Sequence, residues 1–531
     1  MMSYESTNNN ISVNRLLPSL HYLFRALFVL IIVLLAFSFI SICFAEPQIK
    51  SNTTEKWVGT WSTAPQLVET SNNPPSPGLS NNTLRQIVHV SIGGDSLRMR
   101  FSNEFSKSSV TLNSVHIAVS KGNGTIDTTT DKALYFNGKP EVTLVPGTVV
   151  ISDPFQFALQ PLTDVSITIY FGNTSPDVTG HPGSRTTSYL LTGNEVSRAD
   201  FSGAVTADHW YVINTIDILA PDSAYAVAIL GNSITDGRGS GTNKQDRWPD
   251  ELARRFQANP NTRYVAVLNE GIGGNCVLGT CLGPSALSRF GRDVLNQNGV
   301  KWVIILEGIN DIGYAWNSTQ VAQNLISAFG QMIDSAHARD LLVYGATLLP
   351  FGGSSYDSPD HQKAWQTVND WIRDSGRFDA VIDLDSAMHD PANPSKLLPS
   401  YDSGDHLHPS ETGHHMIAEA VDLTLFGAAD TTATVIDEKS DNQPNTFSLW
   451  QNYPNPFNPT TVIKYQLPKS SHVTLKVFDV IGKEVAVLVD EQKNAGSYQV
   501  TLNDSGIASG VYLYQLKAGN FVETKKLVLL K

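Results

Sequence analysis

The chain has 531 residues, a formal net charge of −13, 41% hydrophobic residues and 16% charged residues. Compact domains usually hold about 100–200 residues, so this length predicts three or four of them. The apolar content excludes a globally disordered chain, and the acidic balance argues against a nucleic-acid binder, which needs Lys and Arg to displace counterions. Its cysteines, Cys43, Cys276 and Cys281, are too few for a disulfide-rich scaffold or a four-cysteine zinc site.

The amino-terminal segment has the pattern of an export signal. Residues 1–25 are polar and include two arginines, residues 26–42 are an apolar run, and a small residue, Ala45, ends the segment. This order predicts a signal peptide over residues 1–45. The mature protein is then expected outside the cytoplasm with no stable membrane span. An uncleaved membrane anchor stays the alternative, because the run is long for a signal core.

Residues 46–219 are predicted to form an N-terminal β-sandwich domain. Short runs of alternating apolar and polar residues, separated by Gly, Asn, Asp and Pro, are typical of strands. Two such runs, 84–92 and 96–101, flank a Gly-Gly-Asp sequence at residues 93–95. This pattern predicts a β-hairpin.

Residues 220–429 change to buried strands that alternate with amphipathic helices. Apolar strands in this alternation indicate βαβ units on a parallel sheet, with the ligand site at the carboxyl ends of the strands. Strands are expected at 224–230, 264–269, 302–308, 341–347 and 380–385, and helices at 248–257, 284–297, 318–338, 361–374 and about 411–426. Residues 430–446 are polar and aperiodic, which predicts a linker. Alternating strands after it predict a small β-sandwich over residues 447–531.

The loops that follow the predicted α/β strands carry the groups needed for acyl transfer. Ser233 follows the first strand, Gly274 the second and Asn310 the third, and Asp405 and His408 follow the last. Singly, each has a common structural explanation as a helix cap, a turn residue or a surface histidine. Together they supply a hydroxyl, a base, a group that orients the base, and oxyanion donors, and the topology lets them meet at one sheet edge.

The order of the motifs G-N-S-I-T-D-G, G-I-G-G-N, G-I-N-D and D-x-x-H-P resembles that of SGNH, or GDSL-type, hydrolases. The resemblance covers about residues 221–428 and implies a flavodoxin-like three-layer α/β/α fold and ester hydrolysis without a cofactor. It implies that Ser233 is the nucleophile, that His408 is the general base and that Asp405 is its partner.

The same resemblance implies an oxyanion hole made by the backbone N–H groups of Ser233 and Gly274 and the side-chain amide of Asn310. One position departs from the family. Asn232 stands where an Asp is usual, so the sequence leaves open how this change alters the charge beside the nucleophile.

His406 and His408 would point in opposite directions on an extended segment, and no third ligand is evident, so no metal is expected.

Three further features bear on the site. Residues 57–61 and 181–188 resemble the front half of secreted two-domain SGNH esterases. In this chain, His181 and Arg185 either reach the mouth of the active site or belong only to a turn and a strand of the β-sandwich. Tyr314 and Trp316, just past Asn310, either form a sugar-stacking wall or pack inward.

Cys276 and Cys281 lie in the loop after Gly274. Export to an oxidising compartment and the short intervening turn predict a disulfide between them, with two free thiols as the alternative.

The tail resembles the sorting domain of the type IX secretion system. The resemblance rests on the run N-Y-P-N-P-F-N-P (452–459), the segments 475–479 and 508–512, and the Lys-Lys-Leu ending. It covers about residues 447–531 and implies the type IX secretion machinery as a partner. It also implies passage through the periplasm, followed by release or attachment to the cell surface. The sequence thus predicts an exported serine esterase whose ester substrate is acetylated polysaccharide. A lipase or phospholipase-like acylhydrolase is the alternative enzyme, and a catalytically inactive cell-surface binding protein is the alternative of another class.

Overall fold

The computed structural model describes residues 54–427, 447–450, 452, 455, 457, 460–503, 507–519 and 521–529. The predicted signal peptide, the whole predicted linker (430–446) and part of the 452–459 run lie outside them. Within these ranges, none of the helices is both long and apolar enough to cross a membrane.

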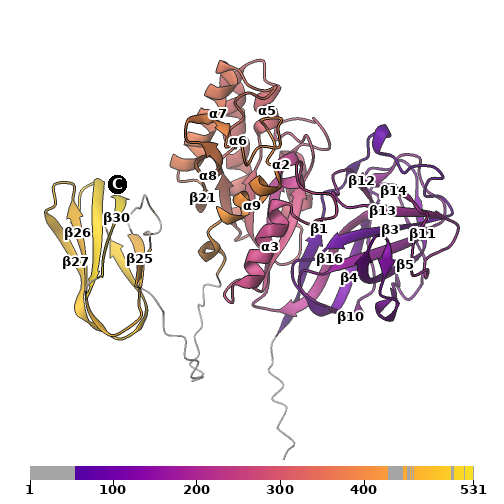
Figure 1. The fold of residues 1–531 in the computed structure, drawn as a ribbon, viewed down its shortest axis with the longest axis horizontal. Coiled ribbons are helices and arrows are strands. Elements are labelled where there is room, and N and C mark those ends of the chain that lie inside the picture. Colours follow the sequence, from indigo (N-terminus) through magenta and orange to yellow (C-terminus); the bar gives the residue numbers. More distant parts are fainter. Residues whose placement is uncertain are drawn as a thin grey trace, which may run out of the picture. The chain divides into compact units, whose positions relative to one another are not determined.

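The amino-terminal part of the described chain consists of antiparallel sheets (Figure 1). One sheet has the order β1–β16–β4–β10, with β9 beside β4; a second has the order β14–β13–β3–β11–β5–β6, with β7 and β8 on β5; a short third has the order β15–β12–β2. The strands are β1 (Glu55–Ser62), β2 (Gln66–Leu67), β3 (Asn82–His89), β4 (Gly94–Ser102), β5 (Val110–Gly122), β6 (Thr125–Ile126), β7 (Lys132–Ala133), β8 (Val142–Leu144), β9 (Val149–Ile151), β10 (Phe155–Leu159), β11 (Asp164–Phe171), β12 (Thr179–His181), β13 (Ser188–Thr192), β14 (Val205–Ala207), β15 (Trp210–Tyr211) and β16 (Ile213–Pro221).

The predicted hairpin around residues 93–95 is wrong. Strands β3 and β4 belong to different sheets: β3 pairs with β11 and β13, and β4 pairs with β10, β16 and β9. Alternating residues of both runs, such as Val88 and Met99, are nevertheless fully buried in one core. A two-residue period identifies the face that enters the core, but it does not say whether the next strand pairs alongside or crosses to the opposite sheet.

The central part is built on a five-stranded parallel sheet with the order β18–β17–β19–β20–β21. Its strands are β17 (Tyr225–Gly231), β18 (Val265–Gly271), β19 (Val300–Leu306), β20 (Leu342–Ala346) and β21 (Ala380–Ile382). Helices α3 and α9 pack together, as do α6 and α7. The helical elements are α2 (Ser233–Asp236), α3 (Trp248–Ala258), α4 (Ala286–Phe290), η4 (Gly291–Leu295), α5 (Ile309–Gly313), α6 (Ser318–His337), α7 (Pro359–Asp374), α8 (Leu384–Met388), α9 (Glu411–Glu419) and η5 (Leu423–Phe426), and β22 (His389–Asp390) pairs with β23 (Asn393–Leu397).

The β-rich part and the parallel-sheet part share one hydrophobic core that runs from Val58 to Phe426. Polar contacts also cross between them. Ser62 Oγ donates a hydrogen bond to Glu270 Oε1 at 2.5 Å, and Val267 N donates to Ser91 Oγ at 3.1 Å. Because they bury apolar surface against each other, the two parts form one structural unit.

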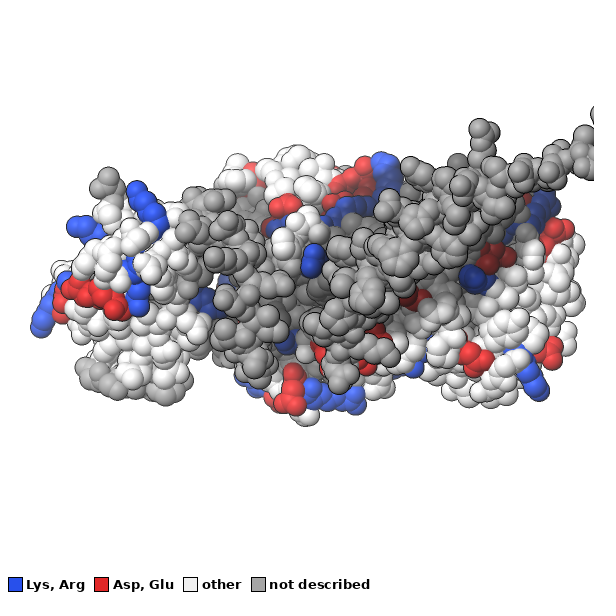
Figure 2. All heavy atoms as spheres, turned by 90° about the horizontal axis from the view of Figure 1, so that it is seen from below, with Lys and Arg blue, Asp and Glu red and all other residues white. Residues whose placement is uncertain are grey.

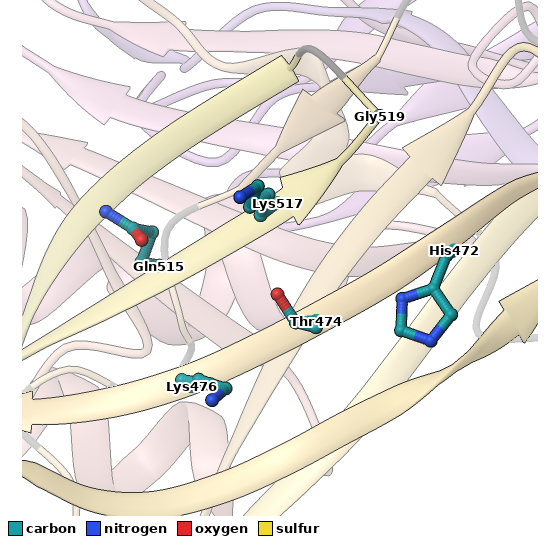
Figure 3. Close-up of a pocket in the computed structure, with 6 residues that line it drawn as sticks. All are labelled: His472, Thr474, Lys476, Gln515, Lys517 and Gly519. Atoms are coloured by element: carbon teal, nitrogen blue, oxygen red, sulfur yellow. The ribbon is translucent and has the colours of Figure 1, made fainter.

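The carboxy-terminal part has a separate core in which Tyr465, Leu475 and Tyr514 are buried. Two sheets surround it, β24–β25–β28 and β27–β26–β29–β30. The strands are β24 (Ser448–Leu449), β25 (Thr460–Leu467), β26 (Ser471–Asp479), β27 (Glu484–Lys493), β28 (Gly496–Asn503), β29 (Gly510–Ala518) and β30 (Phe521–Leu529). Side chains of β26 and β29 line a pocket on the second sheet (Figure 3), among them His472, Thr474, Lys476, Gln515 and Lys517.

The described surface carries charges of both signs. On the face drawn in Figure 2, acidic and basic side chains are interspersed among uncharged ones. Local charges near a site therefore matter more to a ligand that approaches this face than a broad field of one sign.

Candidate active site

Three side chains from distant parts of the sequence form a continuous hydrogen-bonded chain. The Oγ atom of Ser233 lies 2.8 Å from Nε2 of His408. The other ring nitrogen, Nδ1, lies 2.7 Å from Asp405 Oδ2. The backbone N–H of His408 donates to Asp405 Oδ1 at 2.9 Å, so the carboxylate is hydrogen-bonded to both the ring and the main chain of the histidine. This is the geometry needed to transfer a proton from a serine hydroxyl to an imidazole.

Local electrostatics suit that transfer. Burial lowers the pKa of His408, and Asp405 acts in the opposite direction. The imidazole is therefore neutral near pH 7 and able to accept a proton. Burial raises the pKa of Asp405, but hydrogen bonds from the backbone and ring of His408 and from Leu407 N outweigh it and lower the pKa to about 2. The carboxylate thus stays ionised while the imidazole changes charge.

Ser233 is displayed at the first turn after the buried strand β17. It begins α2, and the preceding Asn232 caps this helix by accepting a hydrogen bond from Ile234 N at 3.1 Å. The Asn232 amide donates to Glu307 Oε2 at 3.0 Å. Burial raises the pKa of Glu307 to about 8. An amide at position 232 can donate to this carboxyl group, whereas an ionised Asp could not, which gives the departure from the family motif a physical reason.

Asn310 is held in one orientation from both ends of its amide. Nδ2 donates to Asn275 O at 2.7 Å, and the hydroxyl of Tyr356 donates to Asn310 Oδ1 at 3.0 Å. Because a carbonyl oxygen only accepts, the first contact identifies the nitrogen of the amide. The amide keeps a second N–H that it can offer to a ligand.

The loop after β18 is braced by a disulfide and a carboxylate. Cys276 and Cys281 are bonded, with Cα atoms 5.6 Å apart. Asp311 accepts hydrogen bonds from Val277 N at 2.8 Å and Leu278 N at 3.0 Å. These contacts tie the loop to the beginning of α5, where Asn310 lies.

Gly274 lies in the same loop with a φ of +69°, which favours glycine. A Cβ atom built there would be 2.7 Å from Leu282 Cδ1, so a larger residue would also clash with the loop.

The β-rich part contacts the turn that carries Ser233. His181 Nε2 lies 2.7 Å from Asp236 Oδ1, and both side chains are buried. His181 Nδ1 lies 3.0 Å from Ala64 O. A Cβ atom on Gly183 would be 1.9 Å from Asp236 Oδ2, so only glycine allows this approach. Arg185 Nη2 lies 4.0 Å from the same oxygen. Of the alternatives in the sequence, His181 therefore bears on the nucleophile turn and not only on the β-sandwich.

Tyr314 and Trp316 are not packed inward. Tyr314 is 61% exposed and Trp316 is fully exposed. The ring of Tyr314 meets that of Tyr356 edge to face, with centroids 5.4 Å apart. Tyr314 is thus joined through Tyr356 to Asn310, whereas no ring contact links Trp316 to the described residues near Asn310.

Three residues of this site carried no recognisable signal in the sequence. Glu307 ends the buried run of β19 and looks like a strand terminus, and Tyr356 belongs to a loop 46 residues after Asn310. Arg289 is fully buried and donates to Gly231 O at 3.0 Å, Glu270 O at 2.7 Å and Asn275 Oδ1 at 3.0 Å. Only the alternation of helix residues around Arg289, which places it on the buried face, hints at this position. No cluster of three or more metal-binding side chains occurs among the described residues.

Comparison with known proteins assigns two segments of the chain. The model of the GDSL-like lipase/acylhydrolase family matches residues 229–416, and that of the secretion system C-terminal sorting domain matches residues 451–530. No match was found among curated proteins. The chain therefore combines a domain of the GDSL-like lipase/acylhydrolase family with a C-terminal sorting domain of the type IX secretion system. The sorting domain indicates secretion or attachment to the cell surface.

Several solved structures are similar to part of the chain. A G-D-S-L family protein from Desulfitobacterium hafniense, described as lipolytic, is 22% identical, and the match covers 37% of this chain and 96% of that one with a TM-score of 0.29. A GDSL-like lipase from Bacteroides thetaiotaomicron is 21% identical (38% and 85% covered, TM-score 0.28). An acetylxylan esterase from Geobacillus stearothermophilus is 20% identical (37% and 92% covered, TM-score 0.29).

Proposed function

We propose that the protein is an exported serine esterase that hydrolyses short-chain acyl esters, acetyl esters above all, on extracellular polysaccharide. The observation that carries this proposal is the hydrogen-bonded chain from Ser233 through His408 to Asp405. Its parts match the groups that acyl transfer to water requires.

In the proposed reaction, His408 takes the proton of Ser233 while Oγ attacks the ester carbonyl carbon. The oxyanion that forms accepts hydrogen bonds from the backbone N–H groups of Ser233 and Gly274 and from the amide of Asn310. His408 then gives its proton to the leaving alcohol, which leaves an acyl group on Ser233. A water molecule, deprotonated by His408, attacks the acyl carbon and releases the acid, and the proton returns to Ser233 Oγ.

Two observations support the acyl and alcohol parts of this proposal. Leu282 packs over Gly274, which would leave little room for a long acyl chain beside that N–H group. The exposed rings of Tyr314 and Trp316, just after Asn310, offer flat apolar faces of the kind on which sugar rings can pack. A lipase or phospholipase-like acylhydrolase remains the alternative enzyme, because the description of the matched family names lipases and acylhydrolases.

The test is labelling by a fluorophosphonate, followed by hydrolysis of 4-nitrophenyl esters of increasing chain length and of acetylated xylan. We expect the wild type and a control, Ser288→Ala, to be labelled and active, because Ser288 is exposed. We expect Ser233→Ala to be unlabelled and at least about 10³-fold slower. Activity of Ser233→Ala within tenfold of the wild type would refute the nucleophile. An unlabelled, inactive wild type would instead favour a binding protein, and a preference for long chains would favour the lipase alternative.

A further inference from the structure

Arg185 is held at the edge of the proposed active site although it belongs to the β-rich part. Its guanidinium lies 4.0 Å from Asp236, which ends the turn that begins at Ser233. Its φ is +51°, in the left-handed region that a side chain other than Gly or Asn seldom adopts. Its carbonyl oxygen accepts a hydrogen bond from Asn243 N at 2.9 Å, which stabilises this conformation. The fold thus keeps an arginine here at a cost in backbone strain.

The guanidinium of Arg185 is positioned but incompletely bonded. Its Nε atom is buried without a hydrogen-bond partner among the described residues, and so is Asp236 Oδ2. A separation of 4.0 Å is too long for a hydrogen bond between the two side chains. The Arg185 side chain is 28% exposed, so part of it faces solvent. A guanidinium has five N–H donors, so the donors of its exposed part stay available to a ligand.

A second cation, Arg238, follows the nucleophile turn directly. Its backbone N–H donates to Ser233 O at 2.8 Å, and its side chain is exposed. After burial, which is the main cause, the charges of Arg238 and Arg185 also lower the pKa of His408, against the effect of Asp405. Both guanidinium groups therefore lie within electrostatic reach of the general base.

The positive charges of Arg185 and Arg238 oppose the proposed reaction. His408 becomes a cation when it takes the proton of Ser233, and neighbouring positive charges disfavour that form. A bound anion close to both arginines would offset the repulsion. The two arginines would also explain how an anionic substrate approaches a chain whose net charge is −13. A local pair of cations can attract an anion even where the overall charge of the chain repels it.

We propose that Arg185 and Arg238 bind an anionic group, a carboxylate or a phosphate, on the alcohol half of the ester. The proposal rests on the ester hydrolysis proposed above and narrows its substrate class to esters of acidic alcohols. A guanidinium fork matches the paired oxygens of either group and can donate two hydrogen bonds to them. The carboxylate would come from a uronic-acid polysaccharide, which agrees with the short acyl group proposed above. The phosphate would come from a lysophospholipid, and a preference for that substrate would overturn the short-chain part of the proposed function.

The test compares kcat/KM of the full-length protein on two matched substrate pairs. One pair is acetylated oligogalacturonide against acetylated xylo-oligosaccharide, and the other is a lysophosphatidylglycerol against a monoacylglycerol with the same acyl chain. In one of the pairs we expect the wild type to prefer the anionic member by at least about tenfold, the scale of a charge-assisted hydrogen bond. We expect Arg185→Gln and Arg238→Gln each to reduce the preference, and Arg263→Gln, an exposed control, to retain it.

A second readout uses 4-nitrophenyl acetate, which carries no anionic alcohol. Removing either cation should raise the pKa of His408 and move the acid limb of the kcat/KM profile to higher pH, whereas Arg185→Lys should leave the limb in place. No preference in either wild-type pair, or variants that keep both the preference and the limb, would overturn the anion site. Failure of the wild type to hydrolyse any ester would refute the proposed function itself, and the anion site with it.

Discussion

Glu307 links the stability of the protein to pH, and its effect has a predictable sign. Burial raises the pKa of this carboxyl group from 4.5 to about 8, although Arg289 opposes the shift. Between these pH values the folded protein keeps a proton that the unfolded chain has lost. The free energy of unfolding should therefore fall as the pH rises from 4.5 to about 8 and level off above it. The interval, about 8 minus 4.5, is about 3.5 pH units, or about 5 kcal/mol at about 1.36 kcal/mol per unit.

Replacing Glu307 by Gln should remove this loss. The variant cannot ionise and keeps an oxygen for the hydrogen bond from Asn232, but it turns an NH2 group toward Arg289, 4.0 Å from the present Oε1. We expect Glu307→Gln to be more stable than the wild type by about 2–5 kcal/mol at pH 9 and by much less at pH 5. Urea unfolding followed by tryptophan fluorescence from pH 5 to 9 measures this difference. The exposed control Glu141→Gln should follow the wild type. Stability curves for Glu307→Gln and the wild type that stay parallel would contradict the buried, protonated carboxyl group.

Changes at the oxyanion amide, at Tyr356 and in the tail have three further expected outcomes. Asn310→Ala should lower kcat by about 10²–10³-fold with KM little changed, as measured by steady-state hydrolysis of 4-nitrophenyl acetate, and a change in KM alone would point to substrate binding. Tyr356→Phe keeps the ring but loses the hydrogen bond to Asn310, so kcat should fall by about 2–10-fold in the same assay, and an unchanged kcat would refute the positioning role. Deleting residues 430–531 should leave the esterase activity and the thermal midpoint unchanged, because the tail has its own core, while secretion in the native host should fail.

The sequence predicted the central fold well because its signals are local. Each apolar run with flanking polar residues corresponds to a strand of the parallel sheet, and the long periodic segment at 318–338 corresponds to α6 (Ser318–His337). The segment predicted as one helix at 284–297 is divided between α4 and η4, a π-helix that begins at Gly291. Residue patterns therefore fix which segments are strands and helices more securely than where each ends.

Contacts between distant segments could not be predicted in the same way. The partner strands of β3 and β4 depend on how two sheets close over a core, which the alternation of residues does not encode. Glu307 and Tyr356 owe their positions to Asn232 and Asn310, and nothing in their own sequence neighbourhood marks them. The motif order led to the candidate catalytic residues only because it resembles that of a known family; spacing alone left several explanations open.

The buried pair of His181 and Asp236 suggests that the β-rich part is needed to shape the nucleophile turn. Ala64 O accepts from one ring nitrogen of His181, and Asp236 lies against the other, so His181→Ala would leave a buried carboxylate without its close partner. A buried polar group left without its hydrogen-bond partner typically costs about 1–3 kcal/mol. We expect His181→Ala to lower both the thermal midpoint and kcat, with a smaller effect on KM, because Ser233 and Asp236 share one turn.

The double variant His181→Ala/Asp236→Asn separates this coupling from a simple packing defect. Asn at position 236 replaces the carboxyl group that His181 contacts, so the double variant should lose less stability and less kcat than the sum of the two single variants. The control is His472→Ala, an exposed histidine of the tail, which should change neither quantity. Additive effects of the two single changes would mean that the imidazole and the carboxylate act independently. The β-rich part would then support the site only by covering it. Loss of the His181 side chain should in that case cost no more stability than loss of any other buried contact of the same size.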